Sequence, residues 1–276
     1  MSSVTQRIKE IVQPDHGYLP VSQFKYRQLE DGHTLSRTEN IHPSIMGLVI
    51  DYLSRYMLTG NKLLAFSVPI EGAGIRQLIR KQEGKRRSRK EFPIKKLLTQ
   101  ISGLDDASII ATCQLVLYDA SARVPDAACQ PIDMTKVIPN EETIENIRIM
   151  VNRTLDFFST YGPLIADGFT FEGVDSKVSG YTETVDCGDG DFLTKDTIWE
   201  MKTSRYDINQ THSLQLLMYY IMGKHSGLEI YKEITTLGVF NPRLNRIYRV
   251  KTSDILPQTI KAVEKDVICY VQKERR

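Results

Sequence analysis

The pattern of hydrophobic and polar positions changes near the middle of the chain. Before residue 162, apolar residues recur at helical spacing, most clearly over 42–60, 94–104 and 141–160. After it, residues 169–202 are rich in Thr, Val, Phe, Tyr and Gly in short alternating runs, which is typical of strands and hairpins. Helical spacing returns over 209–222 and ends at Gly223. The spacing then predicts a hairpin from strands at 235–240 and 247–250, and a last helix over 255–272.

This order of elements predicts an α/β fold of the α+β kind, with a mixed central sheet flanked by helices. We expect a single domain over 1–276. Residues 1–40 are polar and interrupted by turn residues, so we expect a loose N-terminal arm there. Residues 75–160 are expected to form a helical insertion that carries a basic segment, and 163–276 to supply the strands and helices of the core.

Composition narrows the class of protein. The 276 residues are 41% hydrophobic and 25% charged with a net charge of +2, which excludes a disordered or fibrous chain. No apolar run is long enough to span a membrane, so we expect no membrane partner. The four cysteines lie far apart and fit neither a zinc motif nor a disulfide scaffold, so we expect buried, reduced thiols in a cytoplasmic protein.

A basic segment stands out against this balanced composition. Residues 76–96 contain ten Lys or Arg and two Glu. Such a segment raises the local positive potential and gains free energy when it meets phosphates. It is interpreted as a nucleic-acid-binding arm, with a solvated loop and a localisation signal as alternatives. Its centre supplies four candidate contacts to nucleic acid: Arg86, Arg87, Arg89 and Lys90.

The residues from 188 to 203 carry the most informative chemistry. If 198–203 is a strand, Glu200 and Lys202 share one face, while Trp199 and Met201 share the other and pack into the core. A turn at 195–196 would return Asp191 to the side of Glu200. Two neighbouring carboxylates repel each other unless a cation joins them, and hard oxygen ligands suit Mg²⁺ or Mn²⁺.

Further polar groups complete this candidate site. A bound divalent ion can hold a phosphodiester oxygen and activate water, and the adjacent Lys202 can orient or deprotonate that water. Gln215 and Tyr219 stand at i, i+4 on one face of the following helix, where they can contact the water or the substrate backbone. Together these residues predict metal-assisted hydrolysis of phosphodiesters.

The run from 188 to 219 resembles the PD-(D/E)XK nuclease superfamily, and within it the RecB-like exonuclease group. GxxD stands at 188–191, ExK at 200–202 and QxxxY at 215–219, in the order typical of that group. The resemblance implies a restriction-endonuclease-like core and exonuclease-like hydrolysis of DNA. It implies that Asp191, Glu200 and the backbone carbonyl of Met201 bind Mg²⁺ or Mn²⁺. It also implies that Lys202 is catalytic, with Gln215 and Tyr219 in auxiliary roles.

The family also places an acid or histidine on a helix upstream of these motifs. Gly47 is followed four positions later by Asp51, which matches the family spacing with an aspartate, so Asp51 is a candidate metal ligand. Glu142 and Glu145, on the helix nearer the core strands, are alternatives. Some RecB-like nucleases hold an iron–sulfur cluster through clustered late cysteines. This chain has no such cluster of cysteines, so we expect no iron–sulfur centre.

The resulting expectation is a single Mg²⁺- or Mn²⁺-dependent deoxyribonuclease domain acting on single- or double-stranded DNA. The sequence contains no helicase motif, so a helicase or recombination partner would be a separate protein. One alternative is a nucleic-acid-binding module of nuclease fold without turnover. Another is a chance motif, because isolated copies of the three short patterns also occur at 83–85, 103–106 and 114–118.

Overall fold

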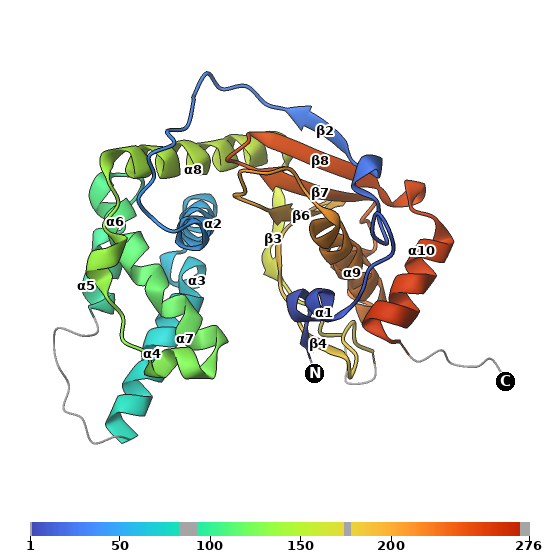
Figure 1. The fold of residues 1–276 in the computed structure, drawn as a ribbon, viewed down its shortest axis with the longest axis horizontal. Helices are drawn as coiled ribbons and strands as arrows, with labels where there is room; N and C mark the ends of the chain where they lie inside the picture. Colours follow the sequence, from blue (N-terminus) through green and yellow to red (C-terminus); the bar gives the residue numbers. More distant parts are fainter. Residues whose placement is uncertain (1, 83–92, 174–177, 271–276) are drawn as a thin grey trace. The chain divides into compact units, whose positions relative to one another are not determined.

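The computed structural model describes residues 2–82, 93–173 and 178–270. They form two compact units (Figure 1), Met1–Glu30 with Phe157–Arg276, and Asp31–Asp156. We call the first the sheet unit and the second the helical unit. The expected helical insertion at 75–160 differs from this division, because the helices between residues 43 and 74 lie in the same compact unit as residues 75–156.

The sheet unit contains a mixed six-stranded sheet with strand order β2-β8-β7-β6-β5-β3. Neighbouring strands are antiparallel except β6 and β7, which are parallel because helix α9 connects them. The predicted α+β class, a mixed sheet flanked by helices, is therefore confirmed. The elements are β1 (Ser2–Ser3), α1 (Val4–Glu10), η1 (Val21–Gln23), β2 (Lys25–Gln28), β3 (Leu164–Phe169), β4 (Val185–Cys187), β5 (Gly190–Thr194), β6 (Thr197–Met201), α9 (Gln210–Ser226), η5 (Glu229–Tyr231), β7 (Thr236–Asn241), β8 (Arg246–Lys251), η6 (Thr252–Asp254), α10 (Pro257–Ala262) and η7 (Val263–Ile268).

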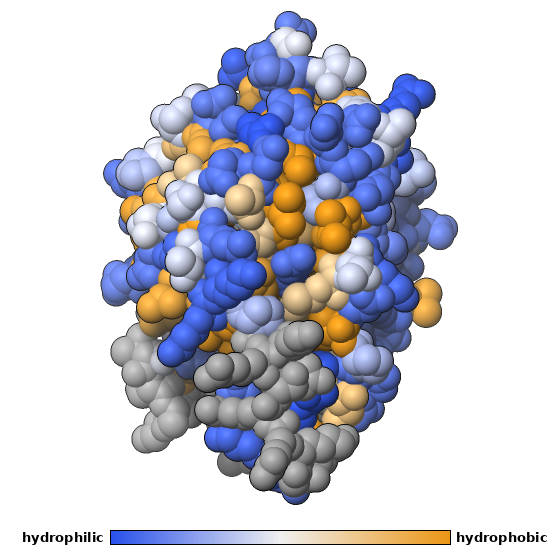
Figure 2. Space-filling model, turned by 90° about the vertical axis from the view of Figure 1, so that its left-hand side faces the viewer, coloured by the Kyte–Doolittle hydropathy of each residue, from blue (hydrophilic) through white to orange (hydrophobic). Residues whose placement is uncertain are grey.

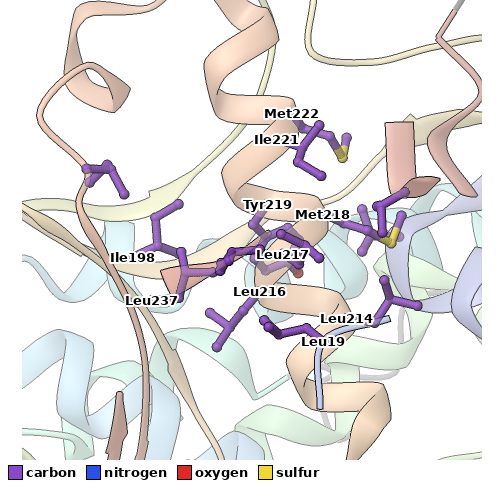
Figure 3. Close-up of a cluster of buried hydrophobic side chains, with 14 of the residues drawn as sticks. Leu19, Ile198, Leu214, Leu216, Leu217, Met218, Tyr219, Ile221, Met222 and Leu237 are labelled. Atoms are coloured by element: carbon purple, nitrogen blue, oxygen red, sulfur yellow. The ribbon is translucent and has the colours of Figure 1, made fainter. Parts of the chain in front are cut away.

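Helix α9 is the central helix of this unit. Its residues from 213 to 219 are all buried, so it has no exposed face over this stretch, as expected for a core helix. Figure 3 shows Leu216 and Leu217 of α9 close to Ile198 of β6 and Leu237 of β7. Leu19, from the N-terminal segment, lies close to Leu214 of the same helix. The buried helix thus ties the strands that carry the sequence motifs to the first residues of the chain.

The expectation of a loose arm over 1–40 is wrong for its first 30 residues. Val4 and Ile8 of α1 are buried in the core of the sheet unit, together with Leu19 and Phe24. The following strand β2 pairs with β8 and forms one edge of the sheet. Apolar residues spaced four apart in a short polar segment suffice to bury one helical face, which the prediction overlooked.

The helical unit is built from α2 (Pro43–Thr59), α3 (Lys62–Ala65), α4 (Ser67–Gln82), α5 (Ile94–Gln100), α6 (Asp106–Leu115), η2 (Val116–Tyr118), α7 (Asp119–Arg123), η3 (Pro125–Cys129), η4 (Met134–Val137) and most of α8 (Glu141–Tyr161). Pro43 at the first helical position and Gly60 with φ of 68° bound α2, as the sequence predicts. The last residues of α8, from 157 onward, belong to the sheet unit.

Two predicted helix ends are wrong. Helix α9 continues past Gly223 to Ser226 and ends at Gly227, whose φ is 71°. A Cβ at position 223 would lie 2.5 Å from the ring of Tyr231, so Gly223 serves close packing rather than termination. The last helix begins at Pro257 and continues as the π-helical turn η7, which ends at Cys269 with φ of 63°.

The cysteines also differ from expectation. All four thiols are free. Cys113 is buried as expected, whereas Cys269 is partly exposed and Cys129 and Cys187 are exposed. Burial raises the pKa of Cys113 to about 12.

Hydrophobic side chains also reach the surface of the chain. Figure 2 shows hydrophobic residues among hydrophilic ones on the visible surface. Among the described residues, no helix combines the length and apolar character needed to cross a bilayer.

Candidate active site

The hairpin of β5 and β6 brings the two predicted acids to matching positions. Phe192 pairs with Trp199 and Leu193 with Ile198. Continuing this antiparallel register places Asp191 opposite Glu200. Directly opposed residues project from the same face of a sheet, so the two carboxylates share a face at one end of the hairpin.

The opposite face of β6 is apolar, as the alternation predicts. The indole of Trp199 makes an edge-on contact with Phe157 of α8, with ring centroids 4.8 Å apart, and its Nε1 donates to Thr194 Oγ1 at 3.0 Å. A Cβ at Gly238 of the neighbouring strand would lie 2.3 Å from the same indole, so glycine is required there. This packing fixes which face of β6 carries Glu200.

Both acids are held by hydrogen bonds at the end of β6. Asp191 Oδ2 accepts the backbone N–H of Met201 at 2.8 Å. Glu200, 4% exposed, accepts Lys202 Nζ at its Oε1 at 2.6 Å. The Lys202 backbone N–H donates to Phe240 of β7 at 3.0 Å, which fixes the base of its side chain.

Helix α9 contributes the amide and phenol predicted from the sequence. Gln215 Nε2 donates to Glu200 Oε1 at 3.1 Å and to the Tyr219 hydroxyl oxygen at 2.8 Å. That hydroxyl donates to the carbonyl of Asp189 at 2.8 Å. Burial and the Glu200 charge raise the pKa of Tyr219 well above 10, so its hydroxyl keeps its proton. We call Asp191, Glu200, Lys202, Gln215 and Tyr219 the carboxylate cluster.

His212 is a neighbour of this cluster that the sequence motifs do not include. It occupies the first turn of α9, where its Nδ1 accepts the backbone N–H of Asn209 at 3.2 Å and completes a capping box. Because Nδ1 is the acceptor, the neutral ring carries its proton on Nε2. Burial and the charge of Lys202 lower the pKa of His212 to about 4, so it is neutral at pH 7.

The loop that follows Lys202 is anchored by the β7–β8 turn. The buried Asn241 donates from Nδ2 to the carbonyl of Ser204 at 2.8 Å, and Arg243 donates from Nε to the carbonyl of Thr203 at 3.1 Å. The sequence indicated only a hairpin turn here. The only signal was two polar residues on either side of Pro242, which does not reveal a partner forty residues earlier.

The donors of the carboxylate cluster fit a hard divalent cation. Asp191, Glu200 and the Met201 carbonyl are oxygen ligands, and Mg²⁺ commonly takes one or two carboxylates, completing its shell with water and substrate phosphate. Within 2–82, 93–173 and 178–270, no group of three or more His, Cys, Asp or Glu side chains is arranged as a metal-binding set.

The candidate third acids lie on helices of the helical unit. Asp51 of α2 is bound by Arg55, whose Nε lies 3.0 Å from each of its carboxylate oxygens. Glu145 forms an ion pair with Arg148, and Glu142 is exposed in the first turn of α8. All three acids therefore belong to the unit that does not carry the carboxylate cluster.

The centre of the predicted basic arm lies outside the described residues, which include neither Arg86, Arg87, Arg89 nor Lys90. Arg76, at its start, is 8% exposed and donates to Ser121 Oγ at 3.2 Å and to the carbonyl of Ala127 at 2.9 Å. The expectation that Arg76 contributes to a phosphate-binding segment is therefore wrong, because its guanidinium holds the helical unit together.

Comparison of the chain with protein-family models, with curated proteins and with solved structures finds no match. The motif order and the geometry of the carboxylate cluster therefore carry the functional argument by themselves.

Proposed function

We propose that this chain is a Mg²⁺- or Mn²⁺-dependent nuclease that hydrolyses DNA phosphodiester bonds in an exonuclease-like manner. The single observation that supports it best is the hydrogen-bonded set of Glu200, Lys202 and Gln215, with Asp191 opposite Glu200 in register. These residues come from two strands and a helix, in the order of the resemblance to RecB-like nucleases. The fold that this implies is restriction-endonuclease-like, and the enzyme is proposed to act in the cytoplasm, with any helicase as a separate partner.

In this proposal, each residue has a defined task. Asp191, Glu200 and the Met201 carbonyl would hold the divalent ion, which would supply charge neutralisation at the phosphate and a water of lowered pKa. Lys202 orients the attacking water or, in its neutral amine form, takes up the proton that the water loses. Gln215 positions the Glu200 carboxylate, and Tyr219 keeps Gln215 in place through a hydroxyl that is anchored on the carbonyl of Asp189.

The test is cleavage of single- and double-stranded DNA by the full chain with Mg²⁺, Mn²⁺ or EDTA. We expect cleavage with either metal and none with EDTA. Lys202→Ala should lower the rate by about 10²-fold or more, in the range typical of a lost proton-transfer group. Lys195→Ala, in the exposed turn of the same hairpin, is the matched control and should leave the rate unchanged. Metal-independent cleavage, or full activity of Lys202→Ala, would contradict the proposal.

A second candidate function is a nucleic-acid-binding module of the same fold without turnover. It is favoured by one observation, that the described residues contain no group of three or more His, Cys, Asp or Glu side chains arranged to hold a metal ion. This alternative predicts DNA binding that is unchanged by EDTA and by Lys202→Ala, with no cleavage under any metal condition.

A further inference from the structure

Four basic side chains gather at the β2 edge of the sheet. Lys25 lies directly opposite Arg249 in the register of β2 and β8, and Arg27 and Lys251 each stand two residues further along. Because side chains alternate with period two, all four project from one face. It is the face covered by α8, since the Arg249 guanidinium lies 5.4 Å from the ring centroid of Tyr161, the last residue of α8. We call these four residues the basic cluster.

No carboxylate among the described residues forms an ion pair with the basic cluster. All four side chains are exposed. Like charges directly opposite each other destabilise an antiparallel pair of strands. Arg27 and Arg249 instead contact Tyr161, by a 3.4 Å hydrogen bond to its hydroxyl and by the ring contact. An anionic partner would therefore reduce the repulsion among these four cations.

A surface cavity accompanies this cluster. Its volume is about 380 Å³, and Lys25, Arg249 and Lys251 line it together with the polar side chains of Gln23 and Thr236. One acid, Asp254, also lines it. Three cations against one carboxylate leave the cavity with a net positive charge, which suits a phosphate group.

We infer that the basic cluster binds the phosphodiester backbone of the nucleic acid, away from the carboxylate cluster. This inference rests on the proposed function, which supplies the class of partner. A nucleic-acid strand offers a row of negative charges, and the basic cluster offers a row of cations spaced about 6.6 Å apart along each strand. The arginines are additionally held against Tyr161, which limits the side-chain freedom that binding would otherwise remove.

The two clusters lie on opposite faces of one sheet. Glu200 contacts Gln215 of α9, whereas Arg249 contacts Tyr161 of α8. A substrate must therefore pass around a sheet edge to touch both, which only a long strand can do. Binding at the basic cluster should therefore depend on the length of the DNA strand, whereas binding at the carboxylate cluster should not.

The test is binding of the full chain to single-stranded DNA of about 30 nucleotides, roughly 100 Å at 3.4 Å per nucleotide, in EDTA over a series of NaCl concentrations. The double variant Lys25→Gln/Lys251→Gln should bind about 10-fold more weakly at low salt. The slope of log K against log salt should fall in magnitude by about 0.7 for each lysine removed, the value typical of single strands. Lys261→Gln, an exposed lysine of α10, is the matched control and should bind like the parent chain.

An unchanged salt slope in the double variant would overturn the inference. The inference would also be overturned if the double variant bound DNA normally but no longer bound vesicles of anionic phospholipid. The basic cluster would then bind a membrane surface. The double variant should cleave a fragment of about 6 nucleotides, near the lower end of single-strand site sizes, at the parental rate. Binding is measured in EDTA and therefore does not depend on cleavage. If the chain binds DNA through the basic cluster but never cleaves it, the proposed nuclease activity is refuted and the inference about the basic cluster stands.

Discussion

Each unit of the molecule buries a carboxylate, and the two carboxylates are held differently. Asp119 of the helical unit and Glu200 of the sheet unit are both 4% exposed. Asp119 accepts Arg123 Nε at 2.8 Å, one helical turn away, and the hydroxyl of Tyr52 from α2. Glu200 accepts Lys202 from the end of its own strand and Gln215 from α9.

The chemistry of the cation separates the two cases. Arginine stays charged and forms a planar, directional contact, whereas lysine is a compact charge whose pKa shifts readily. Burial and the Asp119 charge raise the pKa of Tyr52, so its phenol remains a hydrogen-bond donor. Asp119 therefore serves as a structural hydrogen-bonded contact between helices. The Lys202 side chain is 25% exposed against 5% for Glu200, and a second acid stands opposite Glu200. Of these two buried carboxylates, Glu200 is therefore the one that is paired with a solvent-accessible amine and a second acid.

Catalysis should respond most strongly to a change in these carboxylates. Glu200→Gln keeps the shape of the side chain but removes its charge, so cleavage with Mg²⁺ should fall by about 10²-fold or more. Asp119→Asn makes the same chemical change in the helical unit and should leave cleavage by the folded protein near the parental rate. Initial rates on one DNA substrate, with circular dichroism to verify folding, measure both. Equal losses in the two variants would erase the functional distinction between the carboxylates.

The second effect is on stability. Asp119→Ala leaves the buried Tyr52 hydroxyl without its acceptor, which should lower the free energy of unfolding by about 2–3 kcal/mol. Asp126→Ala, an exposed acid in the same unit, is the control and should change it by less than about 0.5 kcal/mol. Urea unfolding followed by circular dichroism measures both. If Asp119→Ala lowered the free energy of unfolding by less than about 1 kcal/mol, the contacts of Asp119 would not be structural.

Two helical glycines provide a third comparison between the units. Gly223→Ala in α9 forces a methyl group to within 2.5 Å of Tyr231 and should cost about 1–3 kcal/mol. Gly74→Ala in α4 meets no atom within 4 Å, so it should stabilise the chain by about 0.5–1 kcal/mol through helix propensity. Thermal and urea unfolding should move in opposite directions for the two variants. The same sign in both would contradict the packing role of Gly223.

The last comparison concerns the pH dependence of stability. The unfolded chain protonates His212 near pH 6.5 but the folded chain only near pH 4, so the unfolded state binds more protons between these values. Stability is therefore full above about pH 6.5 and falls as the pH drops towards 4, by about 1–2 kcal/mol after allowance for partial solvent screening. His212→Gln keeps a capping-box side chain and should remove this contribution. Unfolding at pH 7 and pH 4.5 compares the two chains, and identical pH slopes would refute the expected neutral imidazole.

Local patterns were sufficient for much of the fold. The turn at Lys195 and Asp196, the burial of Trp199 and the helix carrying Gln215 each follow from alternation or helical spacing within a few residues. Helix ends and segment roles were less predictable. Gly223 continues a helix because Tyr231 packs on it, and the N-terminal segment is ordered because Val4 and Ile8 find a core made by residues 160 or more positions later. Nothing nearby in the sequence specifies those contacts.

Period-two and period-3.6 spacing decide which side chains share a face, so the five residues of the carboxylate cluster and their order are evident from the amino-acid sequence. The packing of the folded chain establishes that Gln215 reaches Glu200, that Arg76 is buried, and that Lys25 stands opposite Arg249. These are contacts between segments far apart in the chain. They depend on strand register and on helix packing, which follow from the burial of the whole core rather than from any local pattern.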